Sequence, residues 1–141
     1  MKKLLCLVLV VMLCGCAARN AARVKQANED AATYQIAADH SKAALSGCVD
    51  QYARRHYRTA EPADISVAVV TACASDRDAF LRDSNLLFHA RARAHYHQPN
   101  DDDPDVDRAA RTAMHEKFKN IDQEIQSQTL ARVLELRAET K

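Results

Sequence analysis

The chain has 141 residues, the length of one domain, and a formal net charge of +1, which argues against the strongly basic character of nucleic-acid-binding proteins. It contains only two glycines and three prolines. A β protein needs many turns and turns use these residues, so we expect a few long helices instead. The sequence patterns of phosphate-binding loops, serine hydrolases and zinc proteases do not occur in it.

The first sixteen residues, MKKLLCLVLVVMLCGC, are typical of an export signal. Lys2 and Lys3 give a positive start, and an unbroken apolar run follows from Leu4 to Leu13. These ten residues are about half of the roughly 20 that a bilayer-spanning helix needs. The segment therefore fits the apolar region of a signal peptide better than a membrane span.

The end of this segment, LCGC at residues 13–16, resembles the lipobox of bacterial lipoproteins. The lipobox consists of an aliphatic residue, a small residue, Gly or Ala, and then Cys. Leu13, Gly15 and Cys16 match it, whereas Cys14 stands where Ala or Ser is commoner. The resemblance implies cleavage after Gly15, with fatty acyl chains such as palmitate on Cys16. Because Ala17 is not Asp, it also implies delivery to the periplasmic face of the outer membrane in a host with two membranes.

Two cysteines remain after Cys6 and Cys14 leave with the signal and Cys16 takes the lipid. Cys48 and Cys73 are equidistant from the midpoint between Ala60 and Glu61, which lies in the turn sequence RTAEPAD, residues 58–64. Two antiparallel helices that meet at this turn would bring them face to face, and an exported chain matures in an oxidising compartment. We therefore expect a Cys48–Cys73 disulfide, which would stabilise the fold by about 3 kcal/mol.

The mature chain is expected to contain three helices. We divide the chain into a signal peptide (1–15), a short lipidated tether (16–27), for which a helix is one possibility, and a helical domain (28–141). The helices should cover about residues 28–58, 62–97 and 104–139. Asn28 suits the N-cap of the first, and Pro62 suits the first turn of the second.

Apolar and small residues recur at heptad spacing and predict helices packed side by side. In the first two helices these positions are Ala31, Tyr34, Ala38, Ser41, Leu45, Cys48, Tyr52, Ile65, Val69, Ala72, Cys73, Ala79, Phe80, Leu86, Leu87 and Ala94. The predicted fold class is all-α, an antiparallel hairpin tied by one disulfide and extended to an up-down-up three-helix bundle. In the alternative, the third helix is free to pair with another copy or a partner.

The acidic loop QPNDDDPDVD (98–107) has two interpretations. A calcium loop that starts at Asp101 would need Gly and Glu at the positions of Val106 and Thr112, which makes calcium the weaker interpretation. We expect instead that Asp103 caps the third helix and that Pro104 takes its first position. The six histidines do not have the spacing of a zinc site, and no cofactor or metal is expected.

Basic residues gather where the tether should meet the end of the second helix. We expect a membrane-facing cluster there, against anionic headgroups, or else a solvated helix surface; its residues are Arg19, Arg23, Lys25, Arg91 and Arg93. No arrangement of residues suggests catalysis, so we do not expect an enzyme. The sequence favours a lipid-anchored envelope protein that works as a structural, adaptor or inhibitor-type interaction module with an envelope protein as partner. The alternative is a periplasmic small-ligand or metal sensor.

Overall fold

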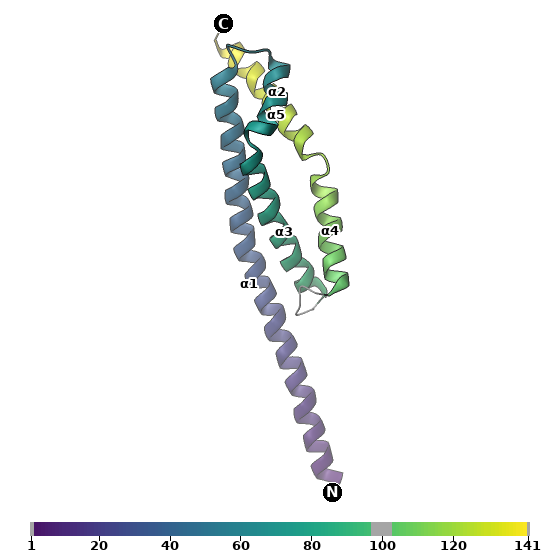
Figure 1. Ribbon diagram of the computed structural model, residues 1–141. Helices are drawn as coiled ribbons and strands as arrows, with labels where there is room; N and C mark the ends of the chain where they lie inside the picture. The colour runs from purple at the N-terminus through teal and green to yellow at the C-terminus, as the bar shows by residue number, and fades with distance from the viewer. Residues whose placement is uncertain (1, 97–102, 141) are drawn as a thin grey trace.

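The computed structural model describes residues 2–96 and 103–140, with side chains from residue 19 onward. This part contains five helices and no strand; the helices are α1 (Lys2–His56), α2 (Pro62–Ala72), α3 (Ala74–Tyr96), α4 (Pro104–Phe118) and α5 (Ile121–Glu139). In Figure 1, α1 runs the length of the molecule, α2 and α3 return beside it, and α4 and α5 run back toward the C-terminus. The all-α, up-down-up arrangement is confirmed, with the second and third legs each divided into two helices.

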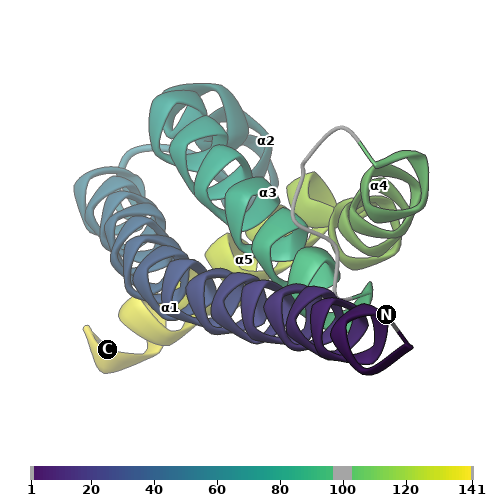
Figure 2. The same ribbon diagram turned by 90° about the horizontal axis from the view of Figure 1, so that it is seen from below.

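Helix α1 does not begin at Asn28, which lies in its interior with an exposed side chain. The predicted N-cap is therefore wrong. Residues 17–34 contain no Gly or Pro and include seven alanines, and Ala is the best helix former. A capping residue starts a helix only where the preceding chain leaves the helical conformation, and here it does not. Figure 1 shows α1 continuing beyond the other helices at its N-terminal end, and Figure 2 views the bundle from that end.

The second leg is interrupted at Cys73, although neither Pro nor Gly stands there. The last bond of α2 runs from the Cys73 N–H to the Val69 carbonyl (2.8 Å), and α3 resumes with the Arg77 N–H to the Cys73 carbonyl (3.0 Å). The sequence around this point, TACASD, is made mostly of weak helix formers. The predicted single helix 62–97 is therefore two helices in the described range.

The third leg is interrupted at the same level of the molecule. Helix α4 ends at Phe118 and α5 begins at Ile121, which divides the helix predicted for 104–139. Arg77, near the start of α3, forms an ion pair with Asp122, in the first turn of α5, at 3.0 Å. The ring of Phe118 also packs edge-on against Phe80 of α3 at 5.3 Å between centroids. The two interruptions therefore lie side by side, at Cys73 and between Phe118 and Ile121. We call this level of the bundle the waist.

In the described residues, the core consists of three apolar clusters along the bundle. The one at the waist contains Leu45, Val49, Val69, Cys73 and Ile125. The one nearer the hairpin turn contains Ala53, Ile65, Val133 and Leu136. The one at the opposite end contains Ala92, Val106 and Ala110. The third leg thus packs on the hairpin, in agreement with the three-helix prediction.

The predicted heptad stripe is correct in the middle of α1 and drifts toward its ends. Ala38, Ser41 and Leu45 are buried, but the next buried positions are Val49 and Ala53. A straight helix has 3.6 residues per turn, so positions that repeat every seven residues rotate away from the neighbouring helix by about 20° per heptad. In the second leg the interruption at Cys73 adds to this drift: Leu86 is 42% exposed, whereas its neighbour Leu87 is buried. The prediction that Leu86 faces the core is wrong.

The C-terminal helix holds the hairpin turn in place. The Arg137 guanidinium donates hydrogen bonds to the Tyr57 carbonyl at 2.8 Å and to the Ala60 carbonyl at 2.5 Å. These carbonyls lie in the connection between α1 and α2, where helix ends leave acceptors without intrahelical partners. Arg137 therefore satisfies turn groups that no local side chain reaches.

Candidate functional site

The candidate site is the end of the bundle nearer the N-terminus, where the end of α3 lies against α1 and α4 begins beside α3. Asp103 caps α4, as predicted: its carboxylate accepts hydrogen bonds from the backbone N–H groups of Asp105 at 2.9 Å and Val106 at 3.4 Å. Pro104 occupies the first helical position. Val106 is fully buried against Phe88 and Ala92 of α3. The cap therefore directs α4 back along α3 and away from α1.

The antiparallel register brings Arg93 of α3 against α1. Its guanidinium forms an ion pair with Asp30 at 3.2 Å, and the two side chains are only 16% and 28% exposed. Asp30 also accepts a hydrogen bond from Gln26 at 2.9 Å. A largely buried arginine beside a carboxylate joins two helices, so Arg93 has a structural role at this end.

Arg91 approaches α1 from a different side. Its guanidinium donates a hydrogen bond to the Gln35 side-chain oxygen at 2.7 Å. Gln35 and Asp30 are five residues apart, which places them roughly 140° apart around the helix. Arg91 and Arg93 therefore straddle α1 and do not point in one direction.

The remaining basic residues of the predicted cluster, Arg19, Arg23 and Lys25, are exposed on α1. Lys25 forms a loose i,i+4 ion pair with Glu29 at 3.7 Å, with both side chains more than half exposed. Arg19 and Arg23 are one helical turn apart and share a face. The structure thus brings all five residues to one end of the molecule but does not join them into a single patch. The sequence indicates how far along its helix each of these residues lies. It does not indicate toward which neighbouring helix each side chain points.

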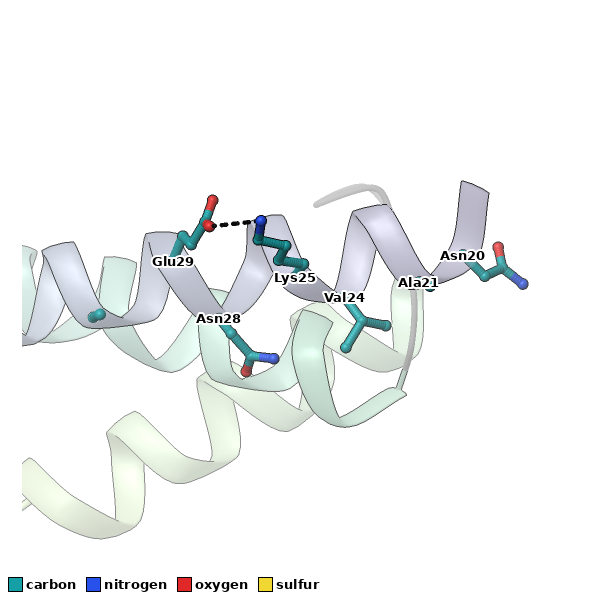
Figure 3. A pocket seen from close by; sticks show the side chains of 7 residues that line it. Asn20, Ala21, Val24, Lys25, Asn28 and Glu29 are labelled. Carbon is teal, nitrogen blue, oxygen red and sulfur yellow. Dashed lines mark ion pairs between the residues drawn. The ribbon is translucent and has the colours of Figure 1, made fainter. Parts of the chain in front are cut away.

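An open hollow of about 870 Å³ lies along α1 at this end (Figure 3). Its lining residues are Asn20, Ala21, Val24, Lys25, Asn28, Glu29 and Ala32. They all belong to one helix, so the described residues offer no opposing wall. Small-molecule sites normally enclose most of their ligand, and this surface is better suited to a flat contact.

The predicted Cys48–Cys73 disulfide is confirmed. It joins α1 to the junction of α2 and α3, with a Cα–Cα distance of 6.0 Å. Cys73 is 1% exposed and lies in the waist cluster, against which Tyr52 and Phe80 also pack. The bond therefore ties α1 to the second leg at the point where that leg is interrupted.

Metal chemistry finds little support in the described residues. No group of three or more His, Cys, Asp or Glu side chains within residues 19–96 and 103–140 lies close enough to hold an ion. Asp101, at which the possible calcium loop would start, lies outside the described residues. A second hollow, between α1 and α5 beside Phe80, measures about 90 Å³, which is enough for a few water molecules and too small for a metabolite.

Comparison with known proteins identifies no similar protein. No family model, curated protein or solved structure matches it. In the part of the chain that the structure describes, no helix is both long and apolar enough to cross a bilayer. The function has to be argued from the residues themselves.

Several large apolar side chains are exposed on the surface of the helices. Leu130 and Leu134 are 38% and 53% exposed on α5. Ile36 on α1 and Val67 on α2 are 73% and 63% exposed. The heptad pattern does not mark Ile36 or Val67, since the pattern selects only positions that face the bundle.

Proposed function

We propose that the chain is an envelope lipoprotein, cleaved before Cys16, anchored through lipid on that residue, and facing the periplasm as a protein-interaction module. The sequence LCGC, directly after a short apolar run, is the observation that carries the proposal. Removing residues 1–15 also removes Lys2 and Lys3, which leaves 18 basic and 19 acidic residues in the mature chain. A near-neutral rod of helices does not attract nucleic acid and leaves binding to local surfaces.

The disulfide supports export. Cys48 and Cys73 are bonded, and disulfides form and persist mainly in compartments outside the cytosol. A chain that carries both a lipobox-like signal and a bonded cysteine pair is consistent with maturation in the periplasm.

The interaction surface that we propose is the outer flank of α5. Leu130 and Leu134 are four residues apart and share an exposed face, beside the buried Val133 and Leu136. Large aliphatic side chains that are repeatedly exposed on one helix face favour contact with another protein. The open hollow on α1 and the small one at the waist favour this role over enclosure of a small ligand.

The anchor is tested with two serine variants of neighbouring cysteines. Cys16→Ser should abolish incorporation of labelled fatty acid and release the protein from membranes, whereas Cys14→Ser should leave both unchanged. Mass spectrometry of the N-terminal peptide should find acylated Cys16 as the first residue. Fatty-acid labelling of the Cys16→Ser protein would rule out this anchor.

The interaction is tested by crosslinking in intact envelopes and pull-down of the tagged, lipidated protein. A Leu130→Gln/Leu134→Gln variant should lose a specific envelope protein that the parent captures. Ile36→Gln, which replaces a more exposed aliphatic side chain on α1, should keep it. Capture that is unaffected by the double substitution would contradict the assignment to α5. A stoichiometric metal or small molecule in the purified protein would favour the sensor alternative.

A further inference from the structure

The first part of mature α1 forms a stalk between the anchor and the bundle. Ala27 is the first buried residue among the described side chains, and α1 is helical from Lys2 onward. Ala27 is the eleventh residue after Cys16, a rise of about 16 Å at 1.5 Å per residue. The bundle therefore begins about 16 Å from the residue that would carry the lipid.

Charge is sorted along this stalk. Residues 16–28 contain Arg19, Arg23 and Lys25 and no carboxylate, and the first acidic residues are Glu29 and Asp30. On the helix, Arg19 lies about 4.5 Å and Arg23 about 10.5 Å beyond Cys16, whereas Glu29 lies about 20 Å beyond it. The cations are thus nearest the anchor, and the anions are at the level of the bundle.

The side-chain direction brings the arginines closer to the lipid. In an α-helix the Cα–Cβ bonds tilt toward the N-terminus, so Arg19 and Arg23 point back toward Cys16. The polar layer on each side of a bilayer is about 5 to 8 Å thick. An arginine one or two turns from a lipidated residue can therefore contact headgroup phosphates.

We propose that α1 enters the headgroup layer end-on and that Arg19 and Arg23 bind the phosphates of anionic phospholipids. This inference rests on the proposed lipid anchor at Cys16 and narrows the predicted basic cluster to these two residues. Arg93 is held by Asp30, Arg91 binds Gln35 on another side of α1, and Lys25 is shared with Glu29. The bundle then stands clear of the lipid surface.

The competing geometry has the helix lying flat on its hollowed face. That face contains Ala21, Val24 and Ala32, and it lies on the opposite side of α1 from Arg19 and Arg23. A flat arrangement would turn both arginines toward water. Lys25 and Glu29, which also line that face, have opposite charges and pair with each other, so the face offers no net positive charge to an anionic surface. The distribution of charge therefore favours the end-on arrangement.

The test uses the mature, lipidated protein in phospholipid vesicles, with a nitroxide on a cysteine introduced at Ala22. Mass spectrometry first verifies the acylated N-terminus; a chain without lipid contradicts the anchor and is recognised before vesicles are used. The nitroxide should be less accessible to a water-soluble nickel chelate in vesicles with anionic lipid than in zwitterionic vesicles. High salt should remove the difference, because it screens surface charge.

Two matched charge variants decide the role of the arginines. In anionic vesicles, Arg19→Gln/Arg23→Gln should reduce the equilibrium ratio of stalk in contact with the lipid surface to stalk in water by roughly 30-fold. The nitroxide accessibility of this variant should then be the same in anionic and zwitterionic vesicles. Arg55→Gln/Arg58→Gln, the same change of charge at the hairpin turn, should retain the difference between the two lipids. Equal accessibility in both lipids, or persistence of the difference in the first variant, would overturn the proposal. So would a nitroxide at Ala21 that is buried while one at Ala22 stays in water, since that pattern reports the flat arrangement.

Discussion

Replacing both cysteines of the Cys48–Cys73 disulfide by alanine should lower the free energy of unfolding by about 3 kcal/mol. The bond closes a loop with a sequence separation of 25 residues, and constraining a loop of this length in the unfolded chain is worth about that amount. Cys73 is only 1% exposed, so the loss of its sulfur also removes contacts in the waist cluster and adds a smaller term. The perturbation therefore acts mainly on the unfolded state.

Urea unfolding followed by circular dichroism measures this loss, and thermal unfolding should show a decrease in Tm of about 10 to 20 °C. The uncrosslinked chain exposes more surface when it unfolds, so its denaturant slope should be larger than that of the oxidised protein. Reduced parent protein should behave like the double variant. Ser46→Ala, an exposed substitution on α1 one turn before the waist residue Val49, should leave the oxidised protein unchanged within about 0.5 kcal/mol.

A loss of less than about 1 kcal/mol in both the variant and the reduced parent would refute this reasoning. That result would mean that the unfolded chain already keeps the two cysteines close without a covalent bond. A large loss in the variant and none on reduction would instead assign the effect to packing of the sulfur atoms.

Three further predictions concern single side chains. Asp103→Ala removes the cap of α4 and should cost about 1 kcal/mol, with faster amide exchange confined to the first turn of α4 in hydrogen-exchange measurements; global exchange would contradict it. Hydrogen bonds, the stronger from Arg54 and the weaker from Arg132, lower the pKa of the Asp50 carboxyl below its ordinary value of 3.8. The ionised carboxylate therefore stabilises the folded protein at neutral pH, and this stabilisation is lost as the pH falls through the folded-state pKa. Unfolding titrations from pH 7 to about pH 2 should therefore show a weaker acid dependence for Asp50→Asn than for the parent, and identical curves would count against the pairing. Arg137→Ala removes two hydrogen bonds to turn carbonyls and should cost about 1.5 to 3 kcal/mol in urea unfolding, whereas Arg137→Lys, which cannot place two donors in the same fork, should recover only part of it.

The hairpin could be predicted because two independent signals agree. The cysteines are equidistant from a point within the turn, and both arms carry apolar residues at heptad spacing. Pro62 does begin α2, and α1 ends at His56, within two residues of the expected Arg58. The long-range pairing thus followed from symmetry about one short turn.

The interruptions of the second and third legs could not be predicted in the same way. Neither Cys73 nor Asn120 is a strong helix breaker, and a run of weak helix formers is often kept helical by packing. Here packing does the opposite, because α2 contacts α5 in one cluster while α3 contacts α4 in another. Only the three-dimensional arrangement decides which outcome holds.

The basic cluster shows the limit of one-dimensional reasoning about a site. The sequence correctly placed Arg91 and Arg93 at the same end of the molecule as Arg19 and Arg23. It could not show that Asp30 holds Arg93 or that Gln35 holds Arg91, because these contacts depend on the rotation of each helix about its axis. Sequence periodicity fixes which residues share a face but not the neighbour toward which that face turns.

Because the helix between Cys16 and Ala27 is unbroken, the number of residues in the stalk determines how far the whole bundle is rotated about the α1 axis. Each residue inserted there would lift the bundle by about 1.5 Å and also rotate it by about 100° about the α1 axis. One added residue would therefore make the α5 flank face a different side of the α1 axis. Seven added residues would lift the flank about 10 Å and leave it rotated by only about 20° from its original orientation. The stalk sets both the reach of the protein and the direction in which it faces its surroundings.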